Sequence, residues 1–474
     1  MADPAIDYED VQGTILRGYR VDLARHFVLA VADAAAARAL VGALVDGRDG
    51  LPRITTAGRW TVKPQCFANI GFTAAGLRAL GVTAAQLATF DEAFQRGATD
   101  PKTAQIVGDV GESAPSRWIG GLGDGAQVHL LLSVWVHEDS ALLESITARL
   151  RAAFAGALRE LYAHDAKALP ANRVHFGYRD SIAQPTIAGA PSRKAKHDAP
   201  DGQPPVPTGE FLLGYLDATP RFVRVQPSEL SRNSSYAAFR ILEQDVVGFE
   251  TFLAEEAPKH GLDPELLAAK LCGRWRNGNP LVLAPDAQGA VLPSDKLNDF
   301  HYRSADPAQD DTIGLKCPIG SHTRRNNPRD QAVVGTDSTH HRIVRRAMPY
   351  GPEYDPRRPE AVPRGLVGYF INASLTNQFE FLTNRWNRDS KFVKAATGPG
   401  GRGAGNATFN ISGEDPFLGV NDPEGSSFTL PGLGELGKNN KRVRGFPRFV
   451  TTRGGAYVFL PSISGLRYLS KLRG

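Results

Sequence analysis

Cysteine is scarce in this sequence: Cys66, Cys272 and Cys317 are its three cysteines, and they lie far apart in the chain. No Cys-x-x-Cys pair occurs, which argues against a zinc ribbon or a dithiol redox site. Three scattered cysteines provide no disulfide framework, so a reducing compartment is the simplest setting. Because no twin-arginine export signal is visible either, we expect a cytoplasmic protein.

Long apolar runs and strong charge are also missing. The longest apolar stretches, such as LLLSVWV at 130–136, are too short to span a bilayer. The N-terminal MADPAIDYED lacks the basic and apolar regions of a secretory signal. The 55 basic and 50 acidic residues leave a formal net charge of +5 without a long basic block. We therefore expect neither a membrane protein nor a dedicated nucleic-acid binder.

What the chain does contain is a strand and helix pattern that occurs twice. At 474 residues and 42% hydrophobic content it can form several domains or one duplicated core. In the first half, apolar periodicity predicts strands at 26–33, 66–72, 128–136 and 210–216, and helices at 34–47, 73–80, 83–94 and 139–163. After a polar connector at 226–236, it predicts strands at 237–244, 365–374 and 455–463, and helices at 245–257 and 376–386. This order favours two α+β units with antiparallel sheets and helices packed on one face.

A glycine-rich run, TGPGGRGAGNAT at 397–408, has the composition of a phosphate-binding loop. It lacks the Gly-Lys-Ser/Thr ending of such loops and follows no clear strand. We therefore interpret it as a flexible surface loop.

Three polar residues stand in unusual contexts. Asp180 lies in VHFGYRDSIAQP, His322 in LKCPIGSHTRRNNPRD and Arg345 in HRIVRRAMPYGPEY. Taken one at a time, each has an ordinary interpretation: a turn or capping aspartate, a surface histidine in a basic patch, and a solvated arginine. The functional interpretations are an axial iron ligand at His322 and, at Arg345, a guanidinium that faces a buried anion such as Asp180.

Together, the segments GYRDSIAQP, CPIGSHTRRNNPR and IVRRAMPYGPE resemble, in that order, the signature segments of the dye-decolorising peroxidases. The family patterns are Gly-x-x-Asp-Gly, a Cys-Pro segment that leads to His-x-Arg-Lys, and an arginine before Gly-Ile-Pro-Tyr-Gly-Pro-Glu. Further family landmarks cover nearly the whole chain: DVQGTILRGY, FANIGFTAAGLRALGV, GEFLLGY, NQFEFLTNRW, DPFLGVNDPEG and GGAYVFLPSISGLRYL.

The resemblance implies one haem b per chain, bound by two ferredoxin-like halves of the dimeric α+β barrel type. The N-terminal half, 1–225, would carry the distal aspartate. The C-terminal half, 226–474, would carry the proximal histidine and the distal arginine. The protein would be a monomer or a homo-oligomer.

The same resemblance implies a role for each motif residue. His322 is the expected proximal iron ligand, Asp180 the distal carboxylate, and Arg345, rather than Arg346, the distal arginine. We expect Glu380 in NQFEF to orient His322 through its other ring nitrogen, which makes the imidazole more basic. The remaining residues expected at the cofactor are Arg324, Ser181, Leu366, Gly368 and Phe459.

The implied activity is oxidation of bulky aromatic or dye-like donors by hydrogen peroxide, in one-electron steps through an oxoferryl intermediate. Asp180 would carry the first proton of peroxide to its far oxygen, and Arg345 would keep Asp180 ionised and stabilise developing negative charge. Because aspartates titrate at lower pH than histidines, we expect a more acidic optimum than that of a histidine-based peroxidase. Bulky donors would not reach the haem, so surface aromatics would relay electrons, with Trp386, Tyr369 and Tyr457 as candidates.

Two departures from the family pattern keep other interpretations open. Ser181 stands where the motif has glycine, and Gly368 stands where many relatives carry a bulky apolar residue. These changes could shift Asp180 or reshape the pocket. The alternative is therefore a haem-binding protein with weak peroxidase turnover, in haem handling or in a specialised small-substrate oxidation. A third interpretation, in which the motifs are relics and no haem binds, disagrees with the presence of His322, Asp180 and Arg345.

Overall fold

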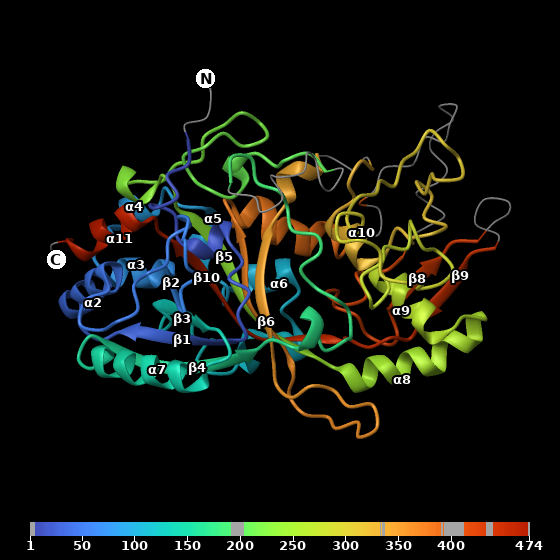
Figure 1. Cartoon of the computed structure of the whole chain (residues 1–474), viewed down its shortest axis with the longest axis horizontal. Helices are drawn as coiled ribbons and strands as arrows, with labels where there is room; N and C mark the ends of the chain where they lie inside the picture. Colours follow the sequence, from blue (N-terminus) through green and yellow to red (C-terminus); the bar gives the residue numbers. More distant parts are fainter. Residues whose placement is uncertain are drawn as a thin grey trace.

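A single antiparallel sheet of eight strands forms the centre of the computed structural model, which describes residues 5–190, 203–331, 333, 337–389, 392, 412–432 and 439–472. Its strand order is β4-β1-β3-β2-β10-β5-β7-β6. Figure 1 labels these strands except β7. The strands are β1 Leu23–Val31, β2 Cys66–Phe72, β3 Leu130–Val136, β4 Leu158–Lys167, β5 Ser235–Gln244, β6 Val344–Tyr350, β7 Gly365–Asn372 and β10 Val450–Leu460. A separate hairpin pairs β8 Ser427–Leu430 with β9 Lys441–Arg444.

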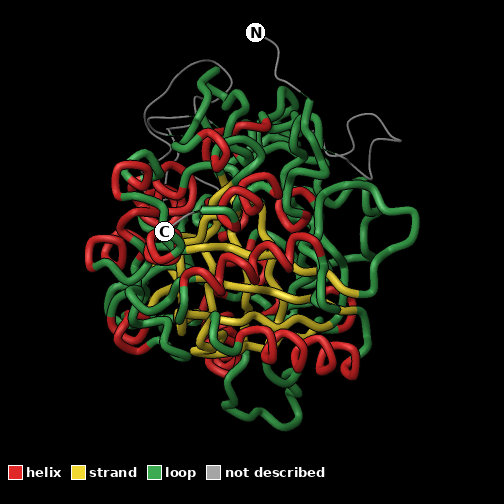
Figure 2. The backbone as a smooth tube through the Cα atoms, turned by 90° about the vertical axis from the view of Figure 1, so that its left-hand side faces the viewer, coloured by secondary structure: helices red, strands yellow, loops and turns green. Residues whose placement is uncertain are grey.

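Helices surround the strands, which cross the middle of the molecule (Figure 2). The α-helices are α1 Gly13–Leu16, α2 Ala34–Asp46, α3 Ala74–Ala79, α4 Ala84–Leu87, α5 Glu92–Arg96, α6 Pro101–Val107, α7 Ser140–Phe154, α8 Val246–Glu256, α9 Pro264–Cys272, α10 His322–Asn326 and α11 Ile463–Ser470. Two π-helical turns, η8 Leu375–Glu380 and η9 Leu382–Trp386, replace the α-helix predicted at 376–386.

The sheet consists of two ferredoxin-like halves. Within β1–β4 the spatial order is fourth, first, third, second, and the strands β5, β6, β7 and β10 repeat that order. The predicted α+β class with two such halves is confirmed. The halves share one sheet rather than forming two, because β10 pairs with β2 at Phe459 and Phe72. The predicted boundary between residues 225 and 226 lies between β4 and β5 and stays a prediction.

Two of the predicted elements in the first half are wrong. The helix predicted at 139–163 ends at Phe154, because Gly156 takes a φ of 77° and residues 158–167 turn back as β4. Pairing along β1 outweighs the helix propensity of this segment. β4 is the closing strand of the half, so the segment 210–216 is not a strand. It follows the 3₁₀ turn η4 Thr208–Glu210 with turns and bends, and only Leu216 forms an isolated bridge, with Phe222.

The two faces of β7 have different environments. Phe370 lies opposite Arg345 of β6, and Leu366 lies opposite Leu242 of β5, so these side chains project from one face of the sheet, which we call the site face. Tyr369 projects from the opposite face, the inner face, where its hydroxyl is hydrogen-bonded to Ser133 of β3 in the first half. The sheet therefore curls so that the two halves pack against each other through their inner faces.

Gly368 of β7 lies opposite Ala347 of β6. A Cβ at this position would collide with the carbonyl group of Arg346 and with the Cα of Ala347. In this chain the backbone of β6 occupies the space that a side chain at residue 368 would take, so glycine fits this position. The effect of Gly368 on the shape of a haem pocket stays a prediction.

Gly368→Ala should therefore lower the stability of the fold. The added methyl group forces β6 and β7 apart, and we expect a decrease of about 1–3 kcal/mol in the free energy of unfolding. Denaturant unfolding measures this change. Gly18→Ala is the control, since a Cβ at Gly18 meets no atom within 4 Å. Equal stability of the two variants would contradict the packing role of Gly368.

The glycine-rich run at 397–408 lies outside the described residues.

Candidate functional site

His322 is held by a buried carboxylate. It is the first residue of α10, which begins after Ser321, and its Nδ1 lies 3.1 Å and 3.0 Å from Oδ1 and Oδ2 of Asp415. The edge of the Phe417 ring packs against the imidazole, with 5.6 Å between the ring centroids. These contacts leave the side chain of His322 23% exposed, so the ring is fixed without being enclosed.

Asp415 is ionised although it is fully buried. Burial raises the pKa of its carboxyl group, but His322, nearby Arg325 and a backbone N–H hydrogen bond outweigh burial, and the pKa falls below its usual value. The N–H groups of Phe417 and Leu418 donate to Oδ1 at 2.9 Å and 2.8 Å. An ionised acceptor at Nδ1 keeps the proton of the imidazole there. Nε2, which has no hydrogen bond within the described residues, then retains its lone pair and can ligate a metal.

Glu380 does not orient His322, which corrects the sequence-based expectation. Its carboxylate accepts hydrogen bonds from Arg96 at 2.7 Å and from the Tyr457 hydroxyl at 3.2 Å. Asp415 has the expected role instead, although it is 93 residues from His322 in the chain. Asp415 belongs to DPFLGVNDPEG, one of the family landmark segments. Its carboxylate accepts hydrogen bonds from the N–H groups of Phe417 and Leu418, two and three residues later, and such local hydrogen bonds are typical of an aspartate with a fixed side chain.

The arginines that follow His322 are structural. Arg324 is fully buried and donates to Asp311 at 3.0 Å and to Gln331 at 3.0 Å. Contrary to the expectation that it lies at the cofactor, its guanidinium group is therefore not available to a haem propionate. Arg325 donates to the carbonyl oxygens of Trp386 at 2.6 Å and Asp389 at 3.0 Å. It therefore ties α10 to the end of η9.

On the predicted distal side, Gln184 joins the loop of Asp180 to β6. The N–H of Arg345 donates to Oε1 of Gln184 at 3.1 Å, and Nε2 of Gln184 donates to the carbonyl oxygen of Arg345 at 3.1 Å. The Gln184 side chain thus pairs with edge strand β6 as a neighbouring strand would. The side chains of Asp180 and Arg345 form no ion pair with each other, and neither is hydrogen-bonded within the described residues.

Ser181 has a backbone conformation that glycine adopts readily. Its φ is 64°, in the left-handed region that favours glycine. Its side chain is exposed, so the serine neither crowds the loop nor displaces the chain at Asp180. A left-handed serine costs about 1–2 kcal/mol, which the fold tolerates here.

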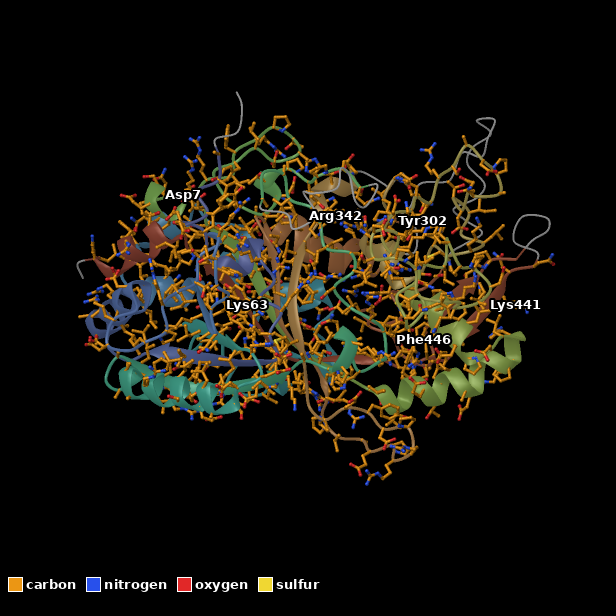
Figure 3. The ribbon with its side chains drawn as sticks, viewed as in Figure 1. Asp7, Lys63, Tyr302, Arg342, Lys441 and Phe446 are labelled. Carbon is orange, nitrogen blue, oxygen red and sulfur yellow. The ribbon has the colours of Figure 1, made fainter. Side chains whose placement is uncertain are left out.

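Arg342 is a cation that sequence reasoning missed. It donates to Oδ1 of Asn327 at 2.9 Å and is labelled in Figure 3, near the upper end of β6. Burial, together with the positive charge of Arg345, lowers the pKa of Arg342 to about 10. Within the described residues no carboxylate pairs with Arg342 or Arg345, so this region carries uncompensated positive charge. The position of Arg342 in HRIVRR, three residues before Arg345, was the sequence signal that could have identified it as a second cation of this region.

The remaining predicted residues are divided between the site face and the core. Leu366 is half-buried on the site face, and Phe459, on the same face, is buried against Phe90, Phe94 and Tyr236. Trp386, Tyr369 and Tyr457 were expected near the surface, but they are 1%, 3% and 1% exposed. None of the three is a surface aromatic to which a bulky donor could bind.

Comparison with known proteins finds similarity along nearly the whole chain. A dye-decolorizing peroxidase of Mycena epipterygia is 30% identical, over 98% of this chain and 87% of the relative. A multifunctional dye peroxidase of an Amycolatopsis strain is 29% identical, over 97% and 95%. The crystal structure of a DyP-type peroxidase from Auricularia auricula-judae is 26% identical, superposes with a TM-score of 0.79, and is covered completely by 98% of this chain. No protein-family model matches.

The side chains of His322, Arg342 and Arg345 fit a haem. His322 offers a bare imidazole nitrogen, the donor that haem iron takes from proteins. The guanidinium groups of Arg342 and Arg345, which pair with no carboxylate of the described residues, offer positive charge to an anionic porphyrin. The fit rests on the hydrogen bond from Nδ1 of His322 and on the charge of these arginines.

Asp415→Asn should weaken haem binding, because the neutral amide no longer holds the Nδ1 proton of His322 as an ionised carboxylate does. Loss of such a partner typically costs about 10–100-fold in affinity. Titration of haem into the apo-protein, followed at the Soret band, measures the change. Glu380→Gln is the control, since Glu380 does not contact His322, and a loss of affinity as large as that of Asp415→Asn would contradict the assignment.

Proposed function

The chain belongs to the dye-decolorising peroxidase family, and we propose that it binds one haem b through His322 and uses hydrogen peroxide to oxidise aromatic donors in one-electron steps. The observation that carries this proposal is the imidazole of His322. Its Nδ1 proton is held by buried, ionised Asp415, and its Nε2 has no hydrogen bond within the described part of the chain. The relatives supply the reaction class, and the geometry of this site supplies the residues.

A haem held by His322 would supply the iron chemistry that reduces hydrogen peroxide. Asp415 keeps the Nδ1 proton on the His322 imidazole, which increases electron donation from Nε2. Asp180 accepts the first proton of peroxide and returns it to the far oxygen. Arg345 stabilises the negative charge that develops on that oxygen. Gln184 fixes the loop of Asp180 against the strand of Arg345, so the two side chains keep their relative positions.

The alternative, a haem-binding protein with weak turnover, rested on Ser181 and Gly368. Ser181 retains the left-handed backbone of a glycine, and Gly368 packs against the backbone of β6. Neither observation supports an altered pocket. No observation in the described residues favours the alternative over the peroxidase.

We propose phenols as donors. A solved dye-decolorizing peroxidase that is 27% identical to this chain, with a TM-score of 0.79, is described as a complex with 2,6-dimethoxyphenol. A phenol gives up one electron and one proton per step, which suits one-electron turnover. For larger dyes, the route of the electron must begin at residues other than Trp386, Tyr369 and Tyr457, because these three are buried.

The cellular location stays a proposal. Within the described residues, no helix combines the length and the apolar character that a membrane crossing requires. All three cysteines are unpaired, which supports the cytoplasmic assignment.

Addition of one equivalent of hydrogen peroxide to the haem-loaded protein should change its Soret band within the mixing time of a stopped-flow experiment. The reason is that His322, Asp180 and Arg345 are all available for the reaction. A Soret band that forms with haem but does not respond to peroxide would contradict the peroxidase and leave haem binding intact.

Asp180→Asn should slow this spectral change by about 10²–10⁴-fold, the usual contribution of a positioned proton-transfer group. The amide cannot accept the first proton of peroxide. Rapid mixing at several peroxide concentrations gives the second-order rate constant. Asp286→Asn, the same substitution at an exposed aspartate outside the site, is the control. Equal rates for the two variants would remove Asp180 from the mechanism.

A further inference from the structure

A chain of hydrogen bonds crosses the inner face of the sheet, on the side opposite the site. The Tyr369 hydroxyl lies 2.6 Å from Oγ of Ser133, and this Oγ lies 2.7 Å from Nδ1 of His26. Tyr369 is 3% exposed, His26 1% and Ser133 0%. Three buried polar groups from strands β7, β3 and β1 are therefore linked in the centre of the core.

The direction of these hydrogen bonds follows from counting the partners. If Tyr369 donates to Ser133 and Ser133 donates to Nδ1 of His26, both hydroxyl protons have an acceptor. The opposite direction leaves the Tyr369 proton without an acceptor, because Ser133 is the hydrogen-bond partner of this hydroxyl within the described residues. Nε2 of His26 is buried without a partner in either case. The first direction leaves fewer buried groups unsatisfied and is therefore favoured.

His26 is a neutral base at the end of this chain. Burial, and the neighbouring imidazole of His164, lower the pKa of His26 to about 3. His164 lies directly opposite His26 in the pairing of β1 with β4, and its Nδ1 lies 3.0 Å from the hydroxyl of half-buried Tyr162. The core thus contains an imidazole with a free lone pair, and no carboxylate is hydrogen-bonded to that ring.

Tyr369 can lose an electron only together with its proton. Burial raises the pKa of its phenol, so the tyrosinate is not formed beforehand. A tyrosine that has lost an electron is a much stronger acid than an imidazolium ion, so an acceptor such as His26 suffices even with a low pKa. The hydrogen bond through Ser133 provides that acceptor at a fixed distance.

We propose that Tyr369 is a redox-active tyrosine that passes its proton through Ser133 to His26 when it loses an electron. The Tyr369 O–H bond breaks, its proton moves to Oγ of Ser133, and the Ser133 proton moves to Nδ1 of His26. One electron passes from Tyr369 to the peroxide-oxidised haem, which leaves a neutral tyrosyl radical and an imidazolium ion. Reduction of the radical by one electron from a donor reverses both proton transfers.

The position of Tyr369 in β7 suits this role. It directly precedes Phe370, which lies opposite Arg345 on the site face. The inner-face tyrosine is therefore the chain neighbour of a residue that contacts the site strand β6 beside Arg345. This inference rests on the proposed function, because the peroxide-oxidised haem is the oxidant.

Electron paramagnetic resonance of the haem-loaded protein, frozen shortly after addition of one equivalent of hydrogen peroxide, tests the proposal. We expect a tyrosyl signal that narrows when the protein is produced with ring-deuterated tyrosine and that is lost in Tyr369→Phe. Tyr236→Phe is the matched control. Tyr236 is equally buried and lies on the site face, but its hydroxyl accepts a hydrogen bond from the Asp91 N–H, and within the described residues it donates none.

Ser133→Ala tests the proton transfer itself. It leaves Tyr369 in place but removes the link to His26, so we expect loss of the signal, and Ser133→Thr, which keeps a hydroxyl, should restore it. Thermal unfolding checks that each variant is folded. A signal unchanged in Tyr369→Phe and Ser133→Ala, with a normal Soret response to peroxide, would overturn this inference alone. A Soret band that does not respond would overturn the proposed function and the inference with it.

Discussion

The hydrogen bond between Nδ1 of His322 and the buried carboxylate of Asp415 is the interaction on which the site depends. A carboxylate without solvent contact stays ionised only if charge and hydrogen bonds compensate its burial, and here His322, Arg325 and a backbone N–H do so. The same compensation fixes the tautomer of the imidazole and directs its lone pair outward. Without Asp415 the histidine would be a partly exposed ring with no preferred protonation site.

Buried arginines hold the backbone that carries this pair. Arg325 crosses from α10 to the carbonyl groups at the end of η9, and Arg324 binds Asp311 beneath the same short helix. A five-residue helix has little stability of its own, so these side chains determine its position. Arg342 and Arg345, at and just before β6, form no ion pair with a carboxylate of the described residues. The basic character of the sequence around His322 thus serves two purposes, packing of the helix and attraction of an anionic cofactor.

The sequence was sufficient for the residues that lie inside contiguous motifs and insufficient for contacts made by the fold. Asp180, His322 and Arg345 could be found because each stands in a recognisable segment. Asp415 could not, because its role depends on a loop that returns to α10 from 93 residues away, and Glu380 was a wrong substitute taken from the nearest familiar segment. The helix predicted through residue 163 failed for a similar reason: β4 forms because β1 offers it a pairing edge, which local propensity does not record.

Ser181 and Gly368 illustrate that a departure from a family pattern has a meaning only in its backbone context. At residue 181 the backbone is left-handed, with a φ of 64°, a conformation that favours glycine, and serine adopts it here. At residue 368 the backbone of β6 occupies the space of a side chain, so glycine is the residue that this strand pairing requires. Both residues therefore preserve the geometry around Asp180 and β6. The distinctive polar chemistry of this chain lies instead on the inner face of β7, where Tyr369 meets Ser133 and His26.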